Sequence, residues 1–185
     1  MKDPVQQRSE VLELLKNAVT LLEQSIDARI LPQSGARIAY AIAGARDKNG
    51  IAAVTGGVVR TGDGKRASGT CAFGADEQIS PIILTAMKFD PIMRSAATIR
   101  YSAKIIPVLE EMLLLCRSFS RSNEPPGIST MDWGVASCCA DGVPDVIFDC
   151  GSNNSEPLIR IFGENPVDVT NNIIMLSNRI IHIEI

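Results

Sequence analysis

Residues 36–60 read ARIAYAIAGARDKNGIAAVTGGVVR, and this stretch decides the fold. Two runs of small and β-branched residues flank the turn DKNG, so we expect strands at 36–43 and 51–60. The glycine-rich residues 61–69 are expected to form a flexible loop, and residues 70–74 a short third strand. Residues 36–74 therefore predict a meander of strands joined by hairpin connections.

Helical patterns lie on both sides of this meander. Upstream, apolar residues recur every three or four positions from 9 to 28, which predicts an amphipathic helix. Downstream, residues 78–178 alternate between helical and strand patterns. The sequence therefore predicts one α/β domain over residues 1–185, with a mixed sheet covered by helices. The downstream helices are expected at 80–89, 90–98, 104–111, 130–140 and 165–178, the strands at 112–119, 143–150 and 156–163, and a β-leaning tail at 179–185.

Composition narrows the class of protein. The 18 basic and 21 acidic residues give a formal charge of −3 without a basic tract, which argues against direct contact with nucleic acid. His182 is the one histidine, so zinc sites built on several histidines are excluded. The N-terminus lacks a signal-peptide pattern, and no apolar run approaches the ~18 residues that span a bilayer. With five cysteines and no C-x-x-C pair, we expect a cytoplasmic protein with free buried thiols.

The glycine loop TGDGKRASG (61–69) fails the two common phosphate-binding patterns. A P-loop needs Ser or Thr after its Gly-Lys, but Arg66 follows Lys65, and a dinucleotide fingerprint needs glycine where Ala67 stands. We therefore expect a mobile hairpin loop. The alternative is a loop whose Lys65 and Arg66 touch a phosphate when it closes.

Charged residues interrupt the otherwise apolar segment 84–102. Lys88, Arg94 and Arg100 lie among residues that would otherwise simply pack, and charges beside buried surface must be paired or serve a ligand. Arginine and lysine can clamp a diphosphate, one as a planar fork and the other as a point charge. Asp90 precedes a proline, so a helix cap is its expected role.

The strand VPDVIFDC (143–150) carries two carboxylates, Asp145 and Asp149. They are four residues apart, so we expect them on one face of the strand. Asp149 ends the strand, where open α/β sheets bind ligands, and it can hold Mg²⁺ or accept hydrogen bonds from an aminated ring. For Asp149, Arg100 and Arg160 a structural ion pair is the alternative, and Trp133 is expected in the core.

Five blocks of the sequence together resemble one known family. The resemblance covers residues 11–175, in the family's order, and the family is the archaeal ThiN-type thiamine-phosphate synthase domain. It implies a three-layer α/β/α sandwich with a mixed sheet, similar to the class II aldolase-like fold. Family members are also found fused to a hydroxymethylpyrimidine-phosphate kinase or to helix-turn-helix regulators. The blocks are SGARIAYAIAGA (34–45), ILTAMKFDPIMRSAATIRYS (83–102), STMDWG (129–134), GVPDVIFDCG (142–151) and EPLIRIFG (156–163).

The resemblance implies a transferase that joins hydroxymethylpyrimidine diphosphate to hydroxyethylthiazole phosphate, forming thiamine phosphate and releasing pyrophosphate. Such an enzyme holds two phosphorylated molecules in line and stabilises the leaving diphosphate, with Mg²⁺ as a candidate cofactor and no residue assigned as a metal ligand. Carried onto this chain, it implies catalytic roles for Lys88, Arg100 and Asp149. The substrate-binding or phosphate-binding residues it implies are Gly35, Arg37, Gly44, Gly74, Gln78, Arg94, Tyr101, Ser102, Gly151 and Arg160.

The sequence departs from the family pattern at two positions. Gln78 stands where the resemblance leads us to expect histidine, and Gly57 where we expect arginine. Both departures remove groups suited to pyrophosphate departure. The alternative function is therefore a non-catalytic domain that binds thiamine phosphate as the sensor of a transcriptional regulator.

The expected partners are the phosphorylated pyrimidine and thiazole precursors, or thiamine phosphate. We expect no membrane contact. The apolar N-terminal helix and the tail RIIHIEI (179–185) suggest pairing between two copies, so a homodimer is a further prediction.

Overall fold

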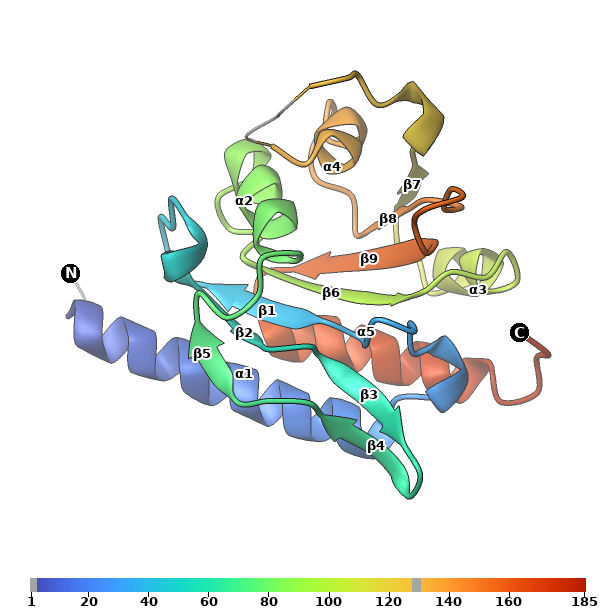
Figure 1. Cartoon of the computed structure of the whole chain (residues 1–185), viewed down its shortest axis with the longest axis horizontal. Helices are drawn as coiled ribbons and strands as arrows, with labels where there is room; N and C mark the ends of the chain where they lie inside the picture. The colour runs from blue at the N-terminus through green and yellow to red at the C-terminus, as the bar shows by residue number, and fades with distance from the viewer. Residues whose placement is uncertain (1–2, 128–130) are drawn as a thin grey trace.

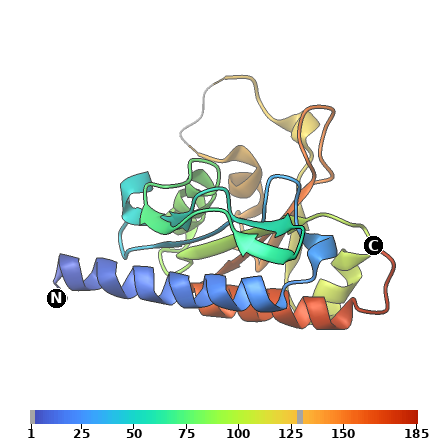
Figure 2. The same ribbon diagram turned by 60° about the horizontal axis from the view of Figure 1, so that its bottom comes forward.

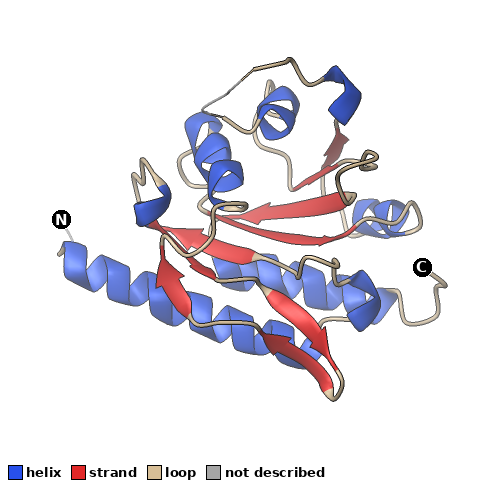
Figure 3. Ribbon diagram, in the orientation of Figure 1, coloured by secondary structure: helices blue, strands red, loops and turns tan. Residues whose placement is uncertain are grey.

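A computed structural model describes residues 3–127 and 131–185. Its main sheet has seven strands in the order β5-β2-β1-β6-β9-β8-β7 (Figures 1 and 3). The β7–β8 pair is parallel and the other neighbouring pairs are antiparallel, so the predicted mixed sheet is confirmed. The strands are β1 (Ile38–Ala41), β2 (Ile51–Val54), β5 (Cys71–Phe73), β6 (Ser95–Arg100), β7 (Cys116–Ser118), β8 (Val146–Phe148) and β9 (Leu158–Gly163).

Helices cover both faces of this sheet. The long helices α1 (Pro4–Ser25) and α5 (Pro166–Arg179) lie side by side against one face (Figure 2), and α2 (Ser80–Phe89) and α4 (Trp133–Cys138) cover the other. Alternation along β1 links the two cores, because Ile38 and Tyr40 pack toward α1 while Ala39 and Ala41 pack toward α2. This arrangement confirms the three-layer α/β/α sandwich.

The first and last helices begin at side-chain caps. Asp3 accepts a hydrogen bond from the amide of Val5, so α1 begins before the predicted residue 9 and ends at Ser25. Asn165 accepts from the amides of Val167 and Asp168 at 3.0 Å, and α5 follows the predicted bounds closely. Within the described residues, no helix combines the length and apolar character needed to span a bilayer.

The predicted strand 51–60 is wrong as a single element. Gly56 and Gly57 have φ angles of +74° and +71°, and they divide the segment into β2 and β3 (Val58–Thr61). A Cβ at Gly57 would lie 2.4 Å from the carbonyl oxygen of Ala36, so glycine is required there. Strand β3 pairs with β4 (Gly64–Ala67) in a separate two-stranded hairpin, and the predicted loop 61–69 is therefore largely paired.

The predicted helix at 90–98 is also wrong. The Asp90 carboxylate accepts from the amide of Ile92 at 3.2 Å and closes a turn, after which β6 starts at Ser95. Ala96 and Ala97 favour helices intrinsically, but they lie fully buried in a strand between β1 and β9, where small side chains fit beneath two covering layers. Helix α3 (Ile105–Glu111) follows as predicted.

Three further expectations need correction. Residues 112–119 form only the short, largely exposed edge strand β7, because Leu113 has a φ of +63° and is 91% exposed. In the tail 179–185, Arg179 ends α5 and the residues after it form turns and no strand. The expected cap Thr130 lies outside the described residues, and the carboxylate of Asp132 caps α4 through the amide of Val135 at 2.9 Å.

The cysteines are free, as predicted, but not all are buried. Cys138 and Cys139 are buried, Cys71 and Cys116 are half-buried, and Cys150 is exposed. Burial raises the pKa of the Cys116 and Cys139 thiols to about 11, so neither is a thiolate near neutral pH.

Candidate functional site

One edge of the main sheet gathers most of the predicted site residues. Strands β1 and β9 begin at this edge, and β6, β7 and β8 end there. Chain segments far apart in sequence therefore present their side chains together. At or beside this edge lie Gly35, Arg37, Arg100, Tyr101, Ser102, Asp149, Gly151 and Arg160, with Gln78 just before the start of α2.

A cavity of about 480 Å³ opens between the start of β9, helices α2 and α4, and residues 119–127. Arg121 and Arg160 line it from two sides, and Phe119 and Trp133 form an aromatic wall with ring centroids 6.1 Å apart, edge to face. We call it the arginine pocket. Gln78, Ile82, Glu124, Pro125, Pro126, Gly127, Met131, Asp132, Gly134 and Leu158 complete the lining.

A single carboxylate holds both arginines. Asp149 is 1% exposed, and its oxygens accept from Arg121 Nε at 2.9 Å and from Arg160 Nη1 at 2.8 Å. Burial alone would raise the pKa of Asp149, but hydrogen bonds and charge from the two arginines outweigh it and hold this pKa below its usual value. Two guanidinium groups share this one buried carboxylate, so positive charge is concentrated at Arg121 and Arg160, while Glu124 and Asp132 place negative charge elsewhere in the lining.

Arg160 has unused hydrogen-bonding capacity. Its side chain is 4% exposed, and its buried Nε has no hydrogen-bond partner among the described residues. A buried donor without a partner costs about 1–3 kcal/mol, so such a group in a native protein calls for an explanation, of which a bound ion or water is one. Together with the two adjacent guanidinium groups, this donor makes the arginine pocket a candidate anion site.

A second ion pair anchors the start of α2 nearby. Arg37 pairs with the buried Asp76, whose carboxylate also accepts from the amides of Gln78 at 2.8 Å and Ile79 at 3.1 Å. Arg37 therefore holds the turn that carries Gln78 to the rim of the pocket. The side chain of Gln78 itself is exposed.

Beyond the start of β9 lies a second hollow of about 650 Å³, lined by Arg100, Tyr101 and residues 152–157. The ring of Tyr101 stacks on Phe148 with centroids 5.7 Å apart, and a hydrogen bond with Cys150 together with burial raises the pKa of its hydroxyl. Gly151 has a φ of +79°, and a Cβ there would lie 2.8 Å from the carbonyl oxygen of Ser155. Glycine therefore lets the loop 152–155 fold back beside the hollow.

The sequence and the shape of this chain match one family. The family model for Thiamine-phosphate synthase ThiN matches residues 14–175. The chain belongs to the ThiN family. It is 35% identical over 165 residues to the Bifunctional thiamine biosynthesis protein ThiDN of Methanocaldococcus jannaschii, which covers 88% of this chain and 39% of that protein. It is 26% identical over 166 residues to Thiamine-phosphate synthase ThiN of Methanothermobacter thermautotrophicus, covering 85% of this chain and 87% of that protein.

Solved structures agree with this membership. The crystal structure of the C-terminal domain of protein MJ0236 superposes with a TM-score of 0.89 at 33% identity, over 96% of this chain and 98% of that one. An aldolase II superfamily protein from Pseudomonas syringae gives a TM-score of 0.51 at 10% identity, over 98% of this chain and 77% of that one. The second likeness confirms the class II aldolase-like fold and no more. This ThiN chain spans less than half the length of the ThiDN relative.

Other residues implied by the ThiN resemblance lie toward the opposite edge of the sheet. Lys88 is exposed in the last turn of α2. Arg94 lies over the ring of Tyr40 at 4.7 Å and donates to the carbonyl oxygen of Ala41 at 3.1 Å, which is a structural arrangement. Gly44 follows β1 and Gly74 follows β5, so neither reaches the arginine pocket. At the site edge, Ser102 accepts from the amide of Lys104 at the start of α3.

The structure also brings in residues that the sequence did not single out. Arg121 lies in a polar segment between β7 and α4, and its partner Asp149 is 28 residues away in the chain. Trp133 is only half-buried and lines the pocket. Asp145 takes no part in the Asp149 cluster, because its carboxylate accepts from the amide of Leu115 at 2.8 Å.

Proposed function

We propose that this chain is a thiamine-phosphate synthase domain that joins hydroxymethylpyrimidine diphosphate to hydroxyethylthiazole phosphate. Its membership in the ThiN family supports the reaction class. The observation that carries the proposal is the pair Arg121 and Arg160, oriented by one buried carboxylate beside an aromatic wall. Such a pocket suits a ring that bears a diphosphate.

Each part of the arginine pocket has a role in this proposal. Arg121 and Arg160 bind the diphosphate and stabilise its growing negative charge as the C–O bond breaks. Phe119 and Trp133 contact the pyrimidine ring. They exclude water from the cationic carbon that remains on the pyrimidine after the diphosphate has left. Pyrophosphate departs with the electron pair of the C–O bond, and the thiazole nitrogen then forms the C–N bond to the cationic carbon, so the positive charge passes to the thiazolium of the product.

Asp149 acts in this scheme as a positioning residue. Both of its oxygens are engaged by arginines, Oδ1 also accepts from the amide of Gly151 at 2.8 Å, and its pKa lies below the usual value. It therefore stays ionised and serves neither as a general base nor as a free metal ligand. The attack needs no proton transfer at the reacting carbon, which agrees with a site that contains no histidine.

The carboxylates in and around the arginine pocket do not form a set of ligands for Mg²⁺. No group of three or more His, Cys, Asp or Glu residues with metal-ligand geometry occurs in the described parts of the chain. Asp149 and Asp76 form ion pairs with arginines, and the carboxylate of Asp132 caps α4. Glu124 at the rim is a single exposed carboxylate. No step proposed here passes through a metal.

A second candidate function is a sensor that binds thiamine phosphate without making it. It is favoured by Gly57, since the backbone at this position has a φ of +71° and touches Ala36, which leaves no room for the expected arginine. Gln78 at the pocket rim likewise cannot supply the charge of a protonated histidine. The sensor would keep the arginine pocket for the phosphate and the aromatic wall for the ring.

One experiment separates the two functions. The purified chain is mixed with both precursors and Mg²⁺, and pyrophosphate release is followed alongside calorimetric binding of thiamine phosphate. Turnover that falls at least tenfold in Arg121→Gln, and not in Arg46→Gln at an exposed turn on the opposite edge, supports the synthase. Binding of thiamine phosphate without turnover would refute the synthase function and support the sensor function. Binding of none of the three compounds would refute both.

A further inference from the structure

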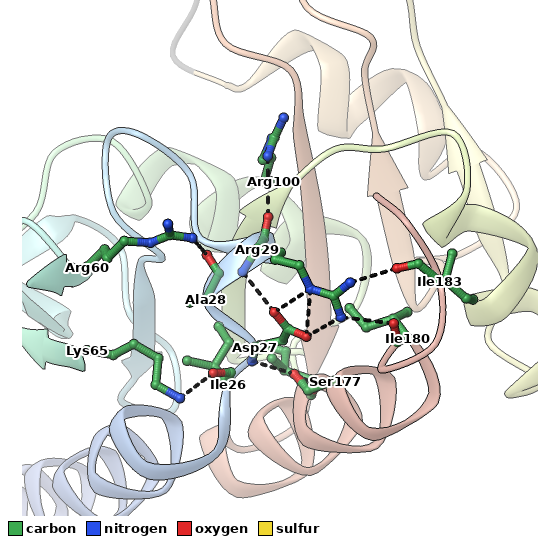
Figure 4. A network of polar contacts seen from close by, with 11 residues as sticks. Ile26, Asp27, Ala28, Arg29, Arg60, Lys65, Arg100, Ser177, Ile180 and Ile183 are labelled. Carbon is green, nitrogen blue, oxygen red and sulfur yellow. Dashed lines mark hydrogen bonds and ion pairs between the residues drawn. The ribbon is translucent and has the colours of Figure 1, made fainter. Parts of the chain in front are cut away.

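A second group of cations surrounds the segment 26–29, which connects α1 to the site edge (Figure 4). Lys65 donates to the carbonyl oxygen of Ile26, Arg60 to that of Ala28 at 2.7 Å, and Arg100 to that of Arg29 at 3.5 Å. Arg60 and Lys65 come from the hairpin β3–β4, and Arg100 from the end of β6. Three separate elements thus bring positive charge to one short segment.

These cations are not neutralised. None of Arg60, Lys65 and Arg100 forms an ion pair with a carboxylate in the described parts of the chain. The nearby carboxylate, Asp27, is already bound by Arg29 through Nε at 3.0 Å and Nη2 at 2.6 Å. Carbonyl groups orient the three side chains without cancelling their charge, so the region carries a net positive charge.

Arg100 lines two neighbouring hollows. One, of about 350 Å³, is lined by Arg60, Arg29, Val59 and residues 31–33. The other is the 650 Å³ hollow with Tyr101 and the loop 152–155, whose amide and hydroxyl groups can donate hydrogen bonds. The lining carboxylate, Glu156, already accepts from the amide of Gln33 at 2.7 Å and from Ser34.

The arginine pocket and the hollow beside Arg100 share no lining residue among those described, and they approach each other at the start of β9. Leu158 lines the arginine pocket, while the preceding Pro157 and Glu156 line the hollow beside Arg100. The proposed reaction requires two phosphorylated molecules whose negative charges repel each other, so it needs two separate sets of cations with the reacting atoms between them.

We propose that Arg60 and Arg100 bind the phosphate monoester of the second substrate, with its ring beside Tyr101, while the arginine pocket takes the diphosphate. This inference rests on the proposed function and assigns one substrate to each side of the start of β9. Lys65 stabilises the segment 26–29 through its hydrogen bond to the carbonyl oxygen of Ile26 and does not line either hollow. Arg60 and Arg100 are both exposed, and a ligand can reach them without a change of fold.

The test is calorimetric binding of each precursor separately to the whole chain. The double variant Arg60→Gln/Arg100→Gln is expected to weaken hydroxyethylthiazole phosphate at least tenfold and to change hydroxymethylpyrimidine diphosphate less than twofold. Arg121→Gln is expected to show the opposite pattern. Arg46→Gln, which removes the same charge from an exposed turn at the far edge, should change neither affinity. Circular dichroism and the melting temperature check that each variant is folded.

Each other result has a defined meaning. If the wild-type chain binds neither precursor, the proposed function fails together with this assignment. If it binds both and the double variant loses neither, or loses both equally, only the assignment of the monoester to Arg60 and Arg100 is overturned. If the double variant does not fold, the single variants Arg60→Gln and Arg100→Gln replace it; each must weaken the monoester more than the diphosphate, and equal or no loss overturns the assignment.

Discussion

Asp149→Asn removes one charge and keeps the shape of the side chain. The substitution leaves Arg160, 4% exposed, without its carboxylate, and it loosens Arg121, which is 25% exposed. An amide oxygen can still accept the hydrogen bond from the amide of Gly151, so the turn at 149–151 keeps its main contact. The variant therefore isolates the electrostatic part of the interaction.

The magnitude follows from this burial. Removing one partner of a buried ion pair costs about 3–5 kcal/mol, and the partial exposure of Arg121 places this case at the lower end. A loss of about 3 kcal/mol corresponds to a fall in melting temperature of roughly 6–12 °C for a chain of this size. Urea unfolding at pH 7 measures the free energy. Asp141→Asn, at an exposed pair with Arg117 at 3.6 Å, is the matched control and should cost less than about 1 kcal/mol.

The pH dependence gives the same test a second readout. The pKa of Asp149 is lowered in the folded chain, so its stabilisation is fully present above the ordinary carboxyl pKa and is lost as the pH falls through the folded value. The difference in unfolding free energy between wild type and Asp149→Asn should therefore shrink below about pH 4. A variant within 0.5 kcal/mol of wild type at pH 7, with unchanged diphosphate affinity, would refute the view that this carboxylate organises the pocket.

Three further predictions concern other positions. Gly151→Ala should lower the unfolding free energy by about 2–4 kcal/mol through backbone strain and the clash with Ser155, whereas Gly44→Ala, which meets no atom within 4 Å, should lose only about 1–2 kcal/mol in the same urea titration. Lys88→Gln should leave both precursor affinities within twofold by calorimetry, and a tenfold loss would restore its predicted catalytic role. Arg29→Gln removes donors to the carbonyl oxygens of Ile180 and Ile183, so hydrogen exchange of residues 180–183 should accelerate; unchanged exchange would contradict this role.

Periodicity and caps predicted most of the fold. The pairs Ser80-Pro81 and Asn165-Pro166 predicted the starts of α2 and α5, and the helical pattern of 104–111 predicted α3; these signals are local. The strand β6 was missed because its small residues gain their strand conformation from β1 and β9, more than fifty residues away on either side. The break at Gly57 was missed because it depends on the approach of Ala36.

For the candidate site too, local sequence signals predicted some residues, while residues that depend on contacts between distant segments were missed. Asp149 was predicted from its position at the end of a strand, a rule that local sequence can express. Arg121 carried no such signal, because its importance comes from a carboxylate placed by a different strand. Lys88 was chosen from a motif without knowledge of which edge of the sheet it would occupy, and it lies toward the edge opposite Asp149.

The adjacency of α1 and α5 has a consequence for how the domain folds. Helix α1 packs against α5, which follows it only after residues 26–165, and β9, which pairs with β6, also lies late in the domain. Until residues 166–179 join the fold, the apolar side chains that α5 buries on this face of the sheet stay exposed. Contacts between segments so far apart in sequence form slowly, so a folding intermediate that lacks α5 is prone to aggregate.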